Sequence, residues 1–147
     1  YMSSLFTDTI RKTGGTAGVD IRVKNTSVYE SDGGTSVTQN LVQSLAKAWW
    51  QMNGSGTVAF GDSFNSASIT DHATGDYSVS NTNNMGNATY AALGSCGRNG
   101  DSYVGGDCEM PGQAATTSST IRFFSYNYDA GTGDVTYISG QLSGDLA

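Results

Sequence analysis

Apolar and polar residues alternate along most of the chain from residue 47 onward. Short runs with this period of two are separated by turn-rich segments such as NGSG, HATGD, NTNNMGN and DAGTGD. Alternation places successive side chains on opposite faces, which is the pattern of a half-buried β-strand. We therefore expect strands over residues 47–53, 57–65, 68–72, 76–82, 89–96, 120–129 and 134–141.

The last two of these strands form the clearest predicted hairpin, with AGTG as its turn. In the first arm, one face is expected to carry Ile121, Phe123, Ser125 and Asn127, and the other Phe124, Tyr126 and Tyr128. Short strands at this spacing predict an all-β fold, an antiparallel β-sandwich or jelly-roll-like domain over residues 49–147.

Two adjacent tryptophans, Trp49 and Trp50, lie in the first of these strands. Neighbouring residues of a strand point to opposite faces, so one indole is expected to fill the core. The other either covers the outside of the domain or lies in a subunit interface.

The N-terminal part of the chain follows a different pattern. Residues 1–35 contain too few apolar side chains to fold alone, and we expect an extended arm with a small β element that anchors the protein to a partner. In residues 36–48, Val37, Leu41, Leu45 and Ala48 recur at helical spacing and predict one short helix. Its apolar stripe either packs on the domain or packs against copies of itself around a threefold axis.

Composition narrows the classes of function. Charged residues are 14% of the 147, and the net charge is −6, so the surface consists largely of uncharged polar groups. A nucleic-acid partner is not expected, because affinity for phosphate comes from clustered Lys and Arg. A membrane span is not expected either, since no apolar run approaches the roughly 18 residues that a spanning helix needs.

The two cysteines, Cys96 and Cys108, flank a loop rich in Gly, Asp and Asn. They are either a disulfide that closes this loop or two thiols in a reducing compartment. Two cysteines cannot complete a four-ligand zinc site, and we expect no metal and no cofactor. Asp101 and Asp107 could bind calcium in this loop, but the spacing is not that of an EF-hand and favours a solvated acidic loop.

The sequence does not indicate catalysis. No serine has a G-x-S-x-G context, and Asp71 and His72, as neighbours in a strand, are expected on opposite faces. The only glutamates are Glu30 and Glu109, and most aspartates fall in turns, where they bond their own backbone.

A series of motifs in the middle of the chain resembles a known module. It follows AKAWW (46–50) and reads NGSGT (53–57), SFN (63–65), SITDH (68–72), ATGDY (73–77) and MGNATY (85–90). In order and spacing these motifs resemble small tail-fibre-like virion proteins of marine and freshwater bacteriophages. The opening FTDTIRKTGGTAGVDI is similar to the start of such proteins. The resemblance covers most of the chain and is strongest over residues 46–95, while Trp50, Met52, His72 and residues 96–113 depart from the pattern.

The resemblance implies a non-enzymatic structural protein of the virion surface, at the tail, neck or head. We expect a tail-fibre or receptor-binding component for host adhesion; the alternative is a capsid decoration, collar or neck protein without receptor binding. The implied partners are the chain itself, as a homotrimer, other virion proteins through residues 1–35, and a host surface glycan or protein. Variable loops on a β scaffold usually carry binding, so the candidate contact residues are Arg98, Asn99, Asp101, Tyr103, Tyr126 and Tyr128.

Overall fold

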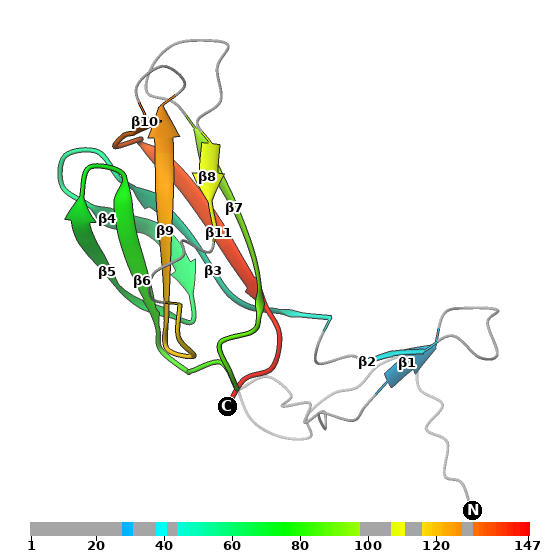
Figure 1. The fold of residues 1–147 in the computed structure, drawn as a ribbon. Helices are drawn as coiled ribbons and strands as arrows, with labels where there is room; N and C mark the ends of the chain where they lie inside the picture. Colours follow the sequence, from blue (N-terminus) through cyan, green and yellow to red (C-terminus); the bar gives the residue numbers. More distant parts are fainter. Residues whose placement is uncertain (1–27, 31–37, 41–43, 98–106, 111–115, 128–130) are drawn as a thin grey trace, which may run out of the picture.

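The computed structural model describes residues 28–30, 38–40, 44–97, 107–110, 116–127 and 131–147, and within them the chain is all-β with no helix. Figure 1 shows the strands in their order along the chain. They are β1 (Val28–Glu30), β2 (Thr38–Asn40), β3 (Ala46–Asn53), β4 (Ala59–Phe64), β5 (Ser66–Ala73), β6 (Asp76–Asn81), β7 (Ala91–Gly97), β8 (Asp107–Glu109), β9 (Thr120–Asn127), β10 (Gly131–Thr132) and β11 (Tyr137–Ser143).

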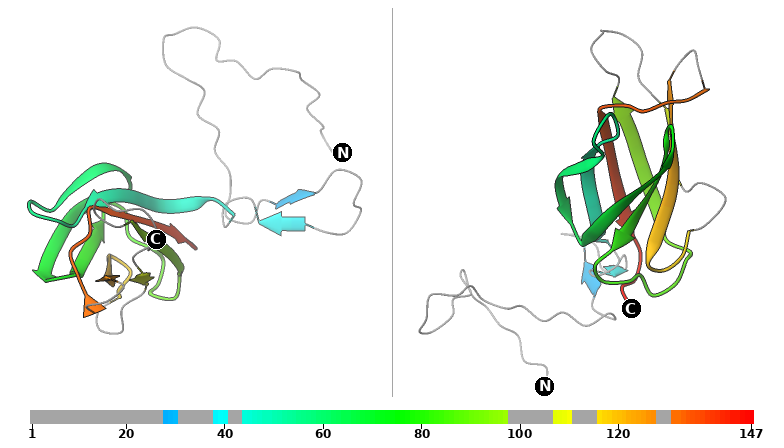
Figure 2. Two further views of the ribbon diagram at one scale, coloured as in Figure 1. Left: turned by 90° about the horizontal axis from the view of Figure 1, so that it is seen from above. Right: turned by 90° about the vertical axis from the view of Figure 1, so that its left-hand side faces the viewer.

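Two antiparallel sheets pack face to face as a β-sandwich (Figures 1 and 2). One sheet contains β5, β6, β9, β10 and β8: β6 and β10 pair with one edge of β9, β8 pairs with its other edge, and β5 pairs with β6. The other sheet has the order β4-β3-β11-β7. β1 and β2 pair with each other in a separate two-stranded sheet. The sequence prediction of an all-β antiparallel sandwich is confirmed.

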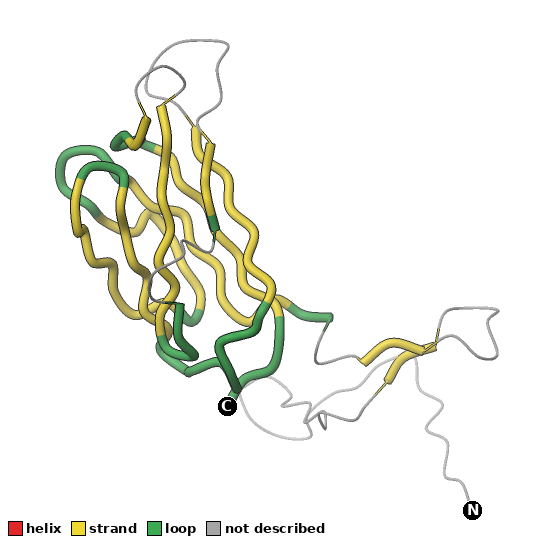
Figure 3. Tube along the Cα trace, viewed as in Figure 1, coloured by secondary structure: helices red, strands yellow, loops and turns green. Residues whose placement is uncertain are grey.

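The core lies between the two sheets, and Figure 3 shows that the described connecting loops lie mainly at the ends of the sandwich. In β3, β9 and β11, alternate residues are buried between the sheets, as the period of two predicts. The ring of Phe123 lies 6.0 Å from that of Trp50 and 5.8 Å from that of Tyr77, measured between centroids, so aromatic contacts join the sheets. The fully buried apolar residues around them include Ala48, Met52, Val79, Ile121, Val135, Ile138 and Leu142.

The indole of Trp50 packs directly against the backbone of Gly140. These residues are cross-strand partners on β3 and β11, and a Cβ atom placed on Gly140 would lie 2.2 Å from Cζ2 of Trp50. Glycine is therefore required opposite this tryptophan. The Nε1 atom of Trp50 is buried without a hydrogen-bond partner, which is a desolvation cost of placing an indole at this point of the core.

A partly buried hydrogen-bond cluster ties the sandwich together at one end. The hydroxyl of Tyr77 lies 2.7 Å from both the Asp134 Oδ1 and the Gly54 carbonyl oxygen. The backbone N–H of Gly75 donates to the same Asp134 oxygen at 2.7 Å. Burial, reinforced by the Asp134 carboxylate, raises the pKa of Tyr77, so the hydroxyl remains a proton donor at neutral pH. The cluster connects β6 with the segments that follow β3 and precede β11.

All seven strands expected from alternation are present, as β3, β4, β5, β6, β7, β9 and β11. Their boundaries agree within a few residues, and β11 begins three residues later than expected. β8 and β10 were not predicted, because three and two residues are too few to show a period. In β9, Ile121, Phe123 and Ser125 are buried, while Phe124 and Tyr126 are partly exposed, as predicted.

The predicted hairpin between β9 and β11 is wrong. β9 pairs with β10, while β11 pairs with β3 and β7 in the other sheet. The chain crosses between the sheets over residues 133–136, where Val135 is buried in the core and its carbonyl accepts a hydrogen bond from Gly54 at 2.9 Å. Val135 and Asp134 thus hold the crossing segment at both sheets, an arrangement that local turn residues do not reveal.

The predicted helix over residues 36–48 is also wrong. Within that segment Thr38–Asn40 forms β2, and β3 begins at Ala46, while Val37 and Leu41 lie outside the described residues. Leu45 is exposed, so the helical stripe does not form. Ala48, the last residue of the predicted stripe, is buried in the core as part of β3. Pairing with β11 and core packing outweigh the weak helical propensity of this segment.

Replacing Gly140 with Ala should destabilise the domain by about 2 kcal/mol or more, because the methyl group overlaps the Trp50 indole and must displace it. Chemical denaturation of the two proteins measures this difference. Gly86→Ala is the matched control, since its Cβ would meet ordinary contacts at 3.5 Å or beyond. Equal loss of stability in both variants would contradict the proposed fit.

Candidate functional site

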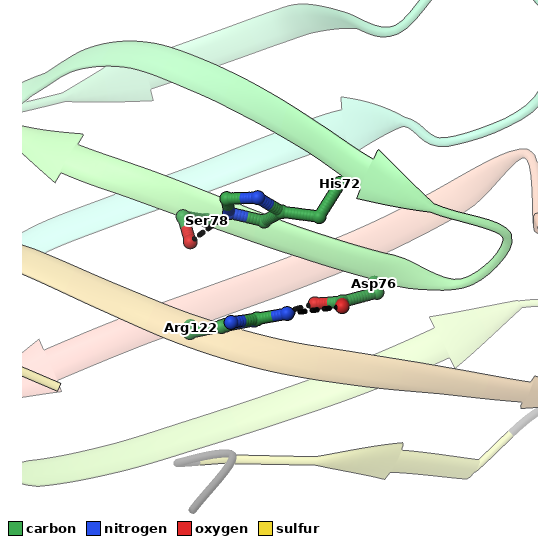
Figure 4. Close-up of polar contacts among 4 residues, drawn as sticks. All are labelled: His72, Asp76, Ser78 and Arg122. Carbon is green, nitrogen blue, oxygen red and sulfur yellow. Dashed lines mark hydrogen bonds and ion pairs between the residues drawn. The ribbon is translucent and has the colours of Figure 1, made fainter. Parts of the chain in front are cut away.

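A cluster of four polar side chains lies on the outer face of the sheet formed by β5, β6 and β9 (Figure 4). Arg122 Nε donates to Asp76 Oδ1 at 2.8 Å, and Arg122 Nη2 donates to Asp76 Oδ2 at 2.5 Å. His72 Nε2 lies 2.8 Å from the hydroxyl oxygen of Ser78. The cluster therefore consists of a bidentate ion pair beside a histidine–serine hydrogen bond.

Strand register explains how these side chains meet. Ser78 pairs with Arg122 of β9 on one side and with Thr70 of β5 on the other, so all three residues face outward. The register between β5 and β6 shifts at His72, which is the extra residue of a β-bulge. The shift brings the imidazole over Ser78, as Figure 4 shows. His72 lies near the end of β5, in agreement with its predicted place at a strand end.

The ion pair controls the protonation of Asp76. The hydrogen bonds from Arg122 hold the pKa of the Asp76 carboxyl below its ordinary value, and the charges of Arg122 and His72 act in the same direction. Burial opposes this shift but does not reverse it. The same hydrogen bonds raise the pKa of Arg122. Both groups are therefore charged at neutral pH.

A polar groove of about 440 Å³ runs beside this cluster. Its hydroxyl groups are largely bonded to one another: Ser80 to Thr120 at 3.4 Å, and Thr117 to Ser119 at 3.1 Å. Because Arg122 also has its carboxylate partner, most of the polar groups lining this groove already have protein partners.

In the described part of the chain, the surroundings of the His72–Ser78 pair differ from those of a serine nucleophile. Among the described residues, no carboxylate oxygen hydrogen-bonds to the imidazole of His72, which a serine–histidine–aspartate arrangement would need. Ser78 lies in the middle of β6, between two paired strands, rather than on an exposed turn. Backbone N–H groups in a paired strand are occupied by the ladder and are poorly placed to stabilise an oxyanion.

The second candidate site is an open groove of about 410 Å³ on the outer face of the other sheet. Two rows of residues cross it. Gln141 of β11 lies between Trp49 of β3 and Leu93 of β7, while Ser139 lies in the next row, between Gln51 and Ser95. None of these lining side chains is charged. The small Ser139 leaves space between the walls that β3 and β7 supply.

Several large apolar side chains are exposed on this face. Trp49 is 38% exposed, Leu93 68% and Tyr137 61%. Phe64, the cross-strand partner of Trp49 on β4, is also exposed. A single face with this much exposed apolar area is typical of an interaction surface.

The prediction that the adjacent tryptophans occupy opposite faces is confirmed, with Trp50 in the core and Trp49 on the outside. Tyr126, an expected contact residue, is partly exposed, and its hydroxyl donates to Glu109 at 2.7 Å. The other expected contact residues lie outside the described part of the chain: Arg98, Asn99, Asp101, Tyr103 and Tyr128.

Of the two alternatives considered for the cysteines, the structure does not contain the disulfide, and Cys96 and Cys108 are both thiols. Cys96 is buried in the core from β7, and Cys108 packs against the same core from β8. The two residues are therefore part of the packed interior, rather than a staple at the surface.

Within the ranges that the structure describes, no group of three or more His, Cys, Asp or Glu residues is arranged to hold a metal ion. Asp101 of the considered calcium loop lies outside those ranges. Those ranges also contain no helix that is long and apolar enough to cross a membrane.

The sequence interpretation did not identify the Asp76–Arg122 pair or the groove beside Trp49. Alternation placed Ser139 and Gln141 on one face of a strand, but their neighbours depend on the pairing of β11 with β3 and β7. Comparison of the chain with protein-family models, with curated proteins and with solved structures finds no match.

Replacing Asp76 with Asn should make the stability of the protein less sensitive to acid. The folded-state pKa of Asp76 lies below the ordinary value of 3.8, so its ion pair stabilises the fold above that value. The contribution is lost as the pH falls through the lower, folded-state pKa. We expect the melting temperatures of wild type and Asp76→Asn to differ at pH 6, and the difference to shrink as the pH falls below 3.8.

Asp62→Asn is the matched control, because Asp62 is exposed and, among the described residues, its carboxylate accepts a hydrogen bond only from the neighbouring Ser63 backbone. A constant difference between wild type and Asp76→Asn over the whole pH range would contradict the assigned role of the ion pair.

Proposed function

We propose that this protein is a non-enzymatic structural protein of a bacteriophage virion that attaches the particle to its host, as a tail-fibre or other receptor-binding component. One observation carries the adhesion role: the groove beside Trp49 combines exposed apolar side chains with three polar ones, Ser95, Ser139 and Gln141, that form no side-chain hydrogen bond with another described residue. The virion assignment rests on the motif order over residues 46–95 and its resemblance to tail-fibre-like proteins.

Binding without catalysis agrees with the chemistry of both outer faces. The groove beside Trp49 is lined by no ionisable side chain that could act as an acid, a base or a nucleophile. On the other face, the His72–Ser78 pair has no carboxylate partner within the described residues, and Asp76 is held by Arg122. Neither arrangement offers a general acid–base pair.

The proposal includes the assembly of the protein in the particle. Residues 1–35, which are poor in apolar side chains, anchor the chain to other virion proteins, and the sandwich domain is displayed outward. Three copies associate as a homotrimer on the virion surface. Repetition of the domain in such an assembly converts weak individual contacts into avidity.

A second candidate function is a capsid decoration, collar or neck protein that does not bind the host. The exposed Phe64, Leu93 and Tyr137 favour this reading, because apolar side chains gathered on one face also suit a contact with a neighbouring virion protein. In that case the same face would be buried within the particle.

Host binding by the purified full-length chain separates the two functions. Fluorescently labelled protein should bind cells of the bacterium that the phage infects, and excess unlabelled protein should slow adsorption of intact particles. Immunogold labelling of virions locates the protein on the particle. Gold on the virion together with an absence of cell binding, even with the protein in its native oligomer, would contradict the adhesion role and favour the decoration role.

A further inference from the structure

The groove beside Trp49 and the polar groove on the opposite face differ in how many of their polar side chains are hydrogen-bonded within the protein. Ser95, Ser139 and Gln141 form no side-chain hydrogen bond with any other described residue. In the opposite groove, His72 is bonded to Ser78 and Arg122 to Asp76. Among the described residues, hydrogen-bonding capacity that the fold does not consume is therefore concentrated beside Trp49, where a ligand can use it.

The arrangement of the groove suits a flat ring that carries hydroxyl groups. Trp49 supplies a partly exposed indole at one wall, and Leu93 supplies an apolar wall on the other side of Gln141. The side-chain amide of Gln141 offers both a donor and an acceptor, and the hydroxyls of Ser95 and Ser139 can do either. A sugar ring presents the complementary set, with C–H groups on its face and hydroxyls at its edge.

The lack of charged side chains in the groove lining selects among hydroxyl-rich ligands. No lining side chain is charged, and the whole chain carries a net charge of −6. A phosphorylated, sulfated or uronic-acid ligand would find no cation in the groove and would be repelled at longer range. The complementary ligand is therefore an uncharged one. The groove is open along the sheet face, so it can accept part of a longer polymer rather than enclosing a small molecule.

A second copy of this chain is the main competing occupant. An interface core is usually depleted of polar groups, which lie at the rim. Here Gln141 lies at the centre, between the apolar residues Trp49 and Leu93, and Ser139 lies beside it between the polar residues Gln51 and Ser95. An apolar surface packed on this centre would leave those groups buried without partners, at a cost in free energy. Hydroxyl groups of a ligand would satisfy them.

We propose that the groove beside Trp49 binds a neutral oligosaccharide, with one sugar ring stacked on the indole of Trp49 and the adjacent hydroxyls bonded to Gln141, Ser139 and Ser95. This inference rests on the proposed adhesion role and gives it a ligand class and a site. Binding at one site is weak, and the repetition of the chain on the particle supplies avidity.

The test titrates the full-length chain with cellohexaose, maltohexaose, xylohexaose and mannohexaose, and with polygalacturonate as the charged comparison. Intrinsic fluorescence reports on the exposed indole and calorimetry gives the affinity. At least one neutral oligosaccharide should bind, and the charged polymer should not. Trp49→Ala should weaken binding about tenfold or more, as truncation of a central aromatic contact does. Gln141→Ala should also weaken binding. Because this variant keeps Trp49, it tests the site even if Trp49→Ala folds poorly.

Tyr137→Ala is the matched control, since it removes an exposed aromatic side chain from β11 on the same face but outside the groove lining. It should bind like the wild type. The inference is overturned if none of the four neutral oligosaccharides binds, or if Trp49→Ala and Gln141→Ala bind as well as the wild type. It is also overturned if the native mass shows an oligomer that Trp49→Ala dissociates, because a second copy would then occupy the groove.

Adsorption assays distinguish failure of this inference from failure of the proposed function. If the wild-type chain and Trp49→Ala compete equally well for host cells, the adhesion role stands and the site is elsewhere. If the wild-type chain itself does not bind cells, the adhesion role fails independently of the oligosaccharide result.

Discussion

The contact between Trp50 and Gly140 is the constraint on which the geometry of the domain depends. The indole fills the centre of the core and can approach the backbone of β11 so closely only because residue 140 has no side chain. It thereby fixes the register of β3 on β11. A slip of one residue would exchange the two faces of β3 and place Trp49 inside. The same register sets Trp49 beside Gln141 on the outer face, so core packing determines the composition of the groove.

The two outer faces of the sandwich use their polar groups in different ways. On the face of β5, β6 and β9, Asp76 is bonded to Arg122 and His72 to Ser78. Both contacts contribute to holding the strands together. On the face of β3, β11 and β7, Ser139 and Gln141 remain available to a ligand. Under the proposed adhesion role, the first face stabilises the fold and the second face binds the ligand. This division supports a binding protein whose specificity comes from shape and hydrogen bonds rather than from charge.

Much of the fold could be predicted from alternation, because strands such as β3, β9 and β11 have one buried, mainly apolar face. The prediction failed where pairing is decided by distant contacts. Asp134 and Val135 carry the chain from one sheet to the other, whereas the local turn sequence suggested a hairpin. The adjacent tryptophans were assigned to opposite faces, but the choice between them depends on Gly140. The groove was missed for the same reason, since its walls come from strands far apart in the sequence.

Oxidation of the two tryptophans by N-bromosuccinimide, followed by peptide mass spectrometry, tests most directly the claim that one indole builds the core while its neighbour meets the ligand. In the native protein Trp49 should be oxidised much faster than Trp50, because Trp49 is 38% exposed and Trp50 is 1% exposed. Saturation with a bound neutral oligosaccharide should then slow the oxidation of Trp49 alone. Similar oxidation rates for both residues, or a Trp49 rate that the saturating ligand leaves unchanged, would contradict the account.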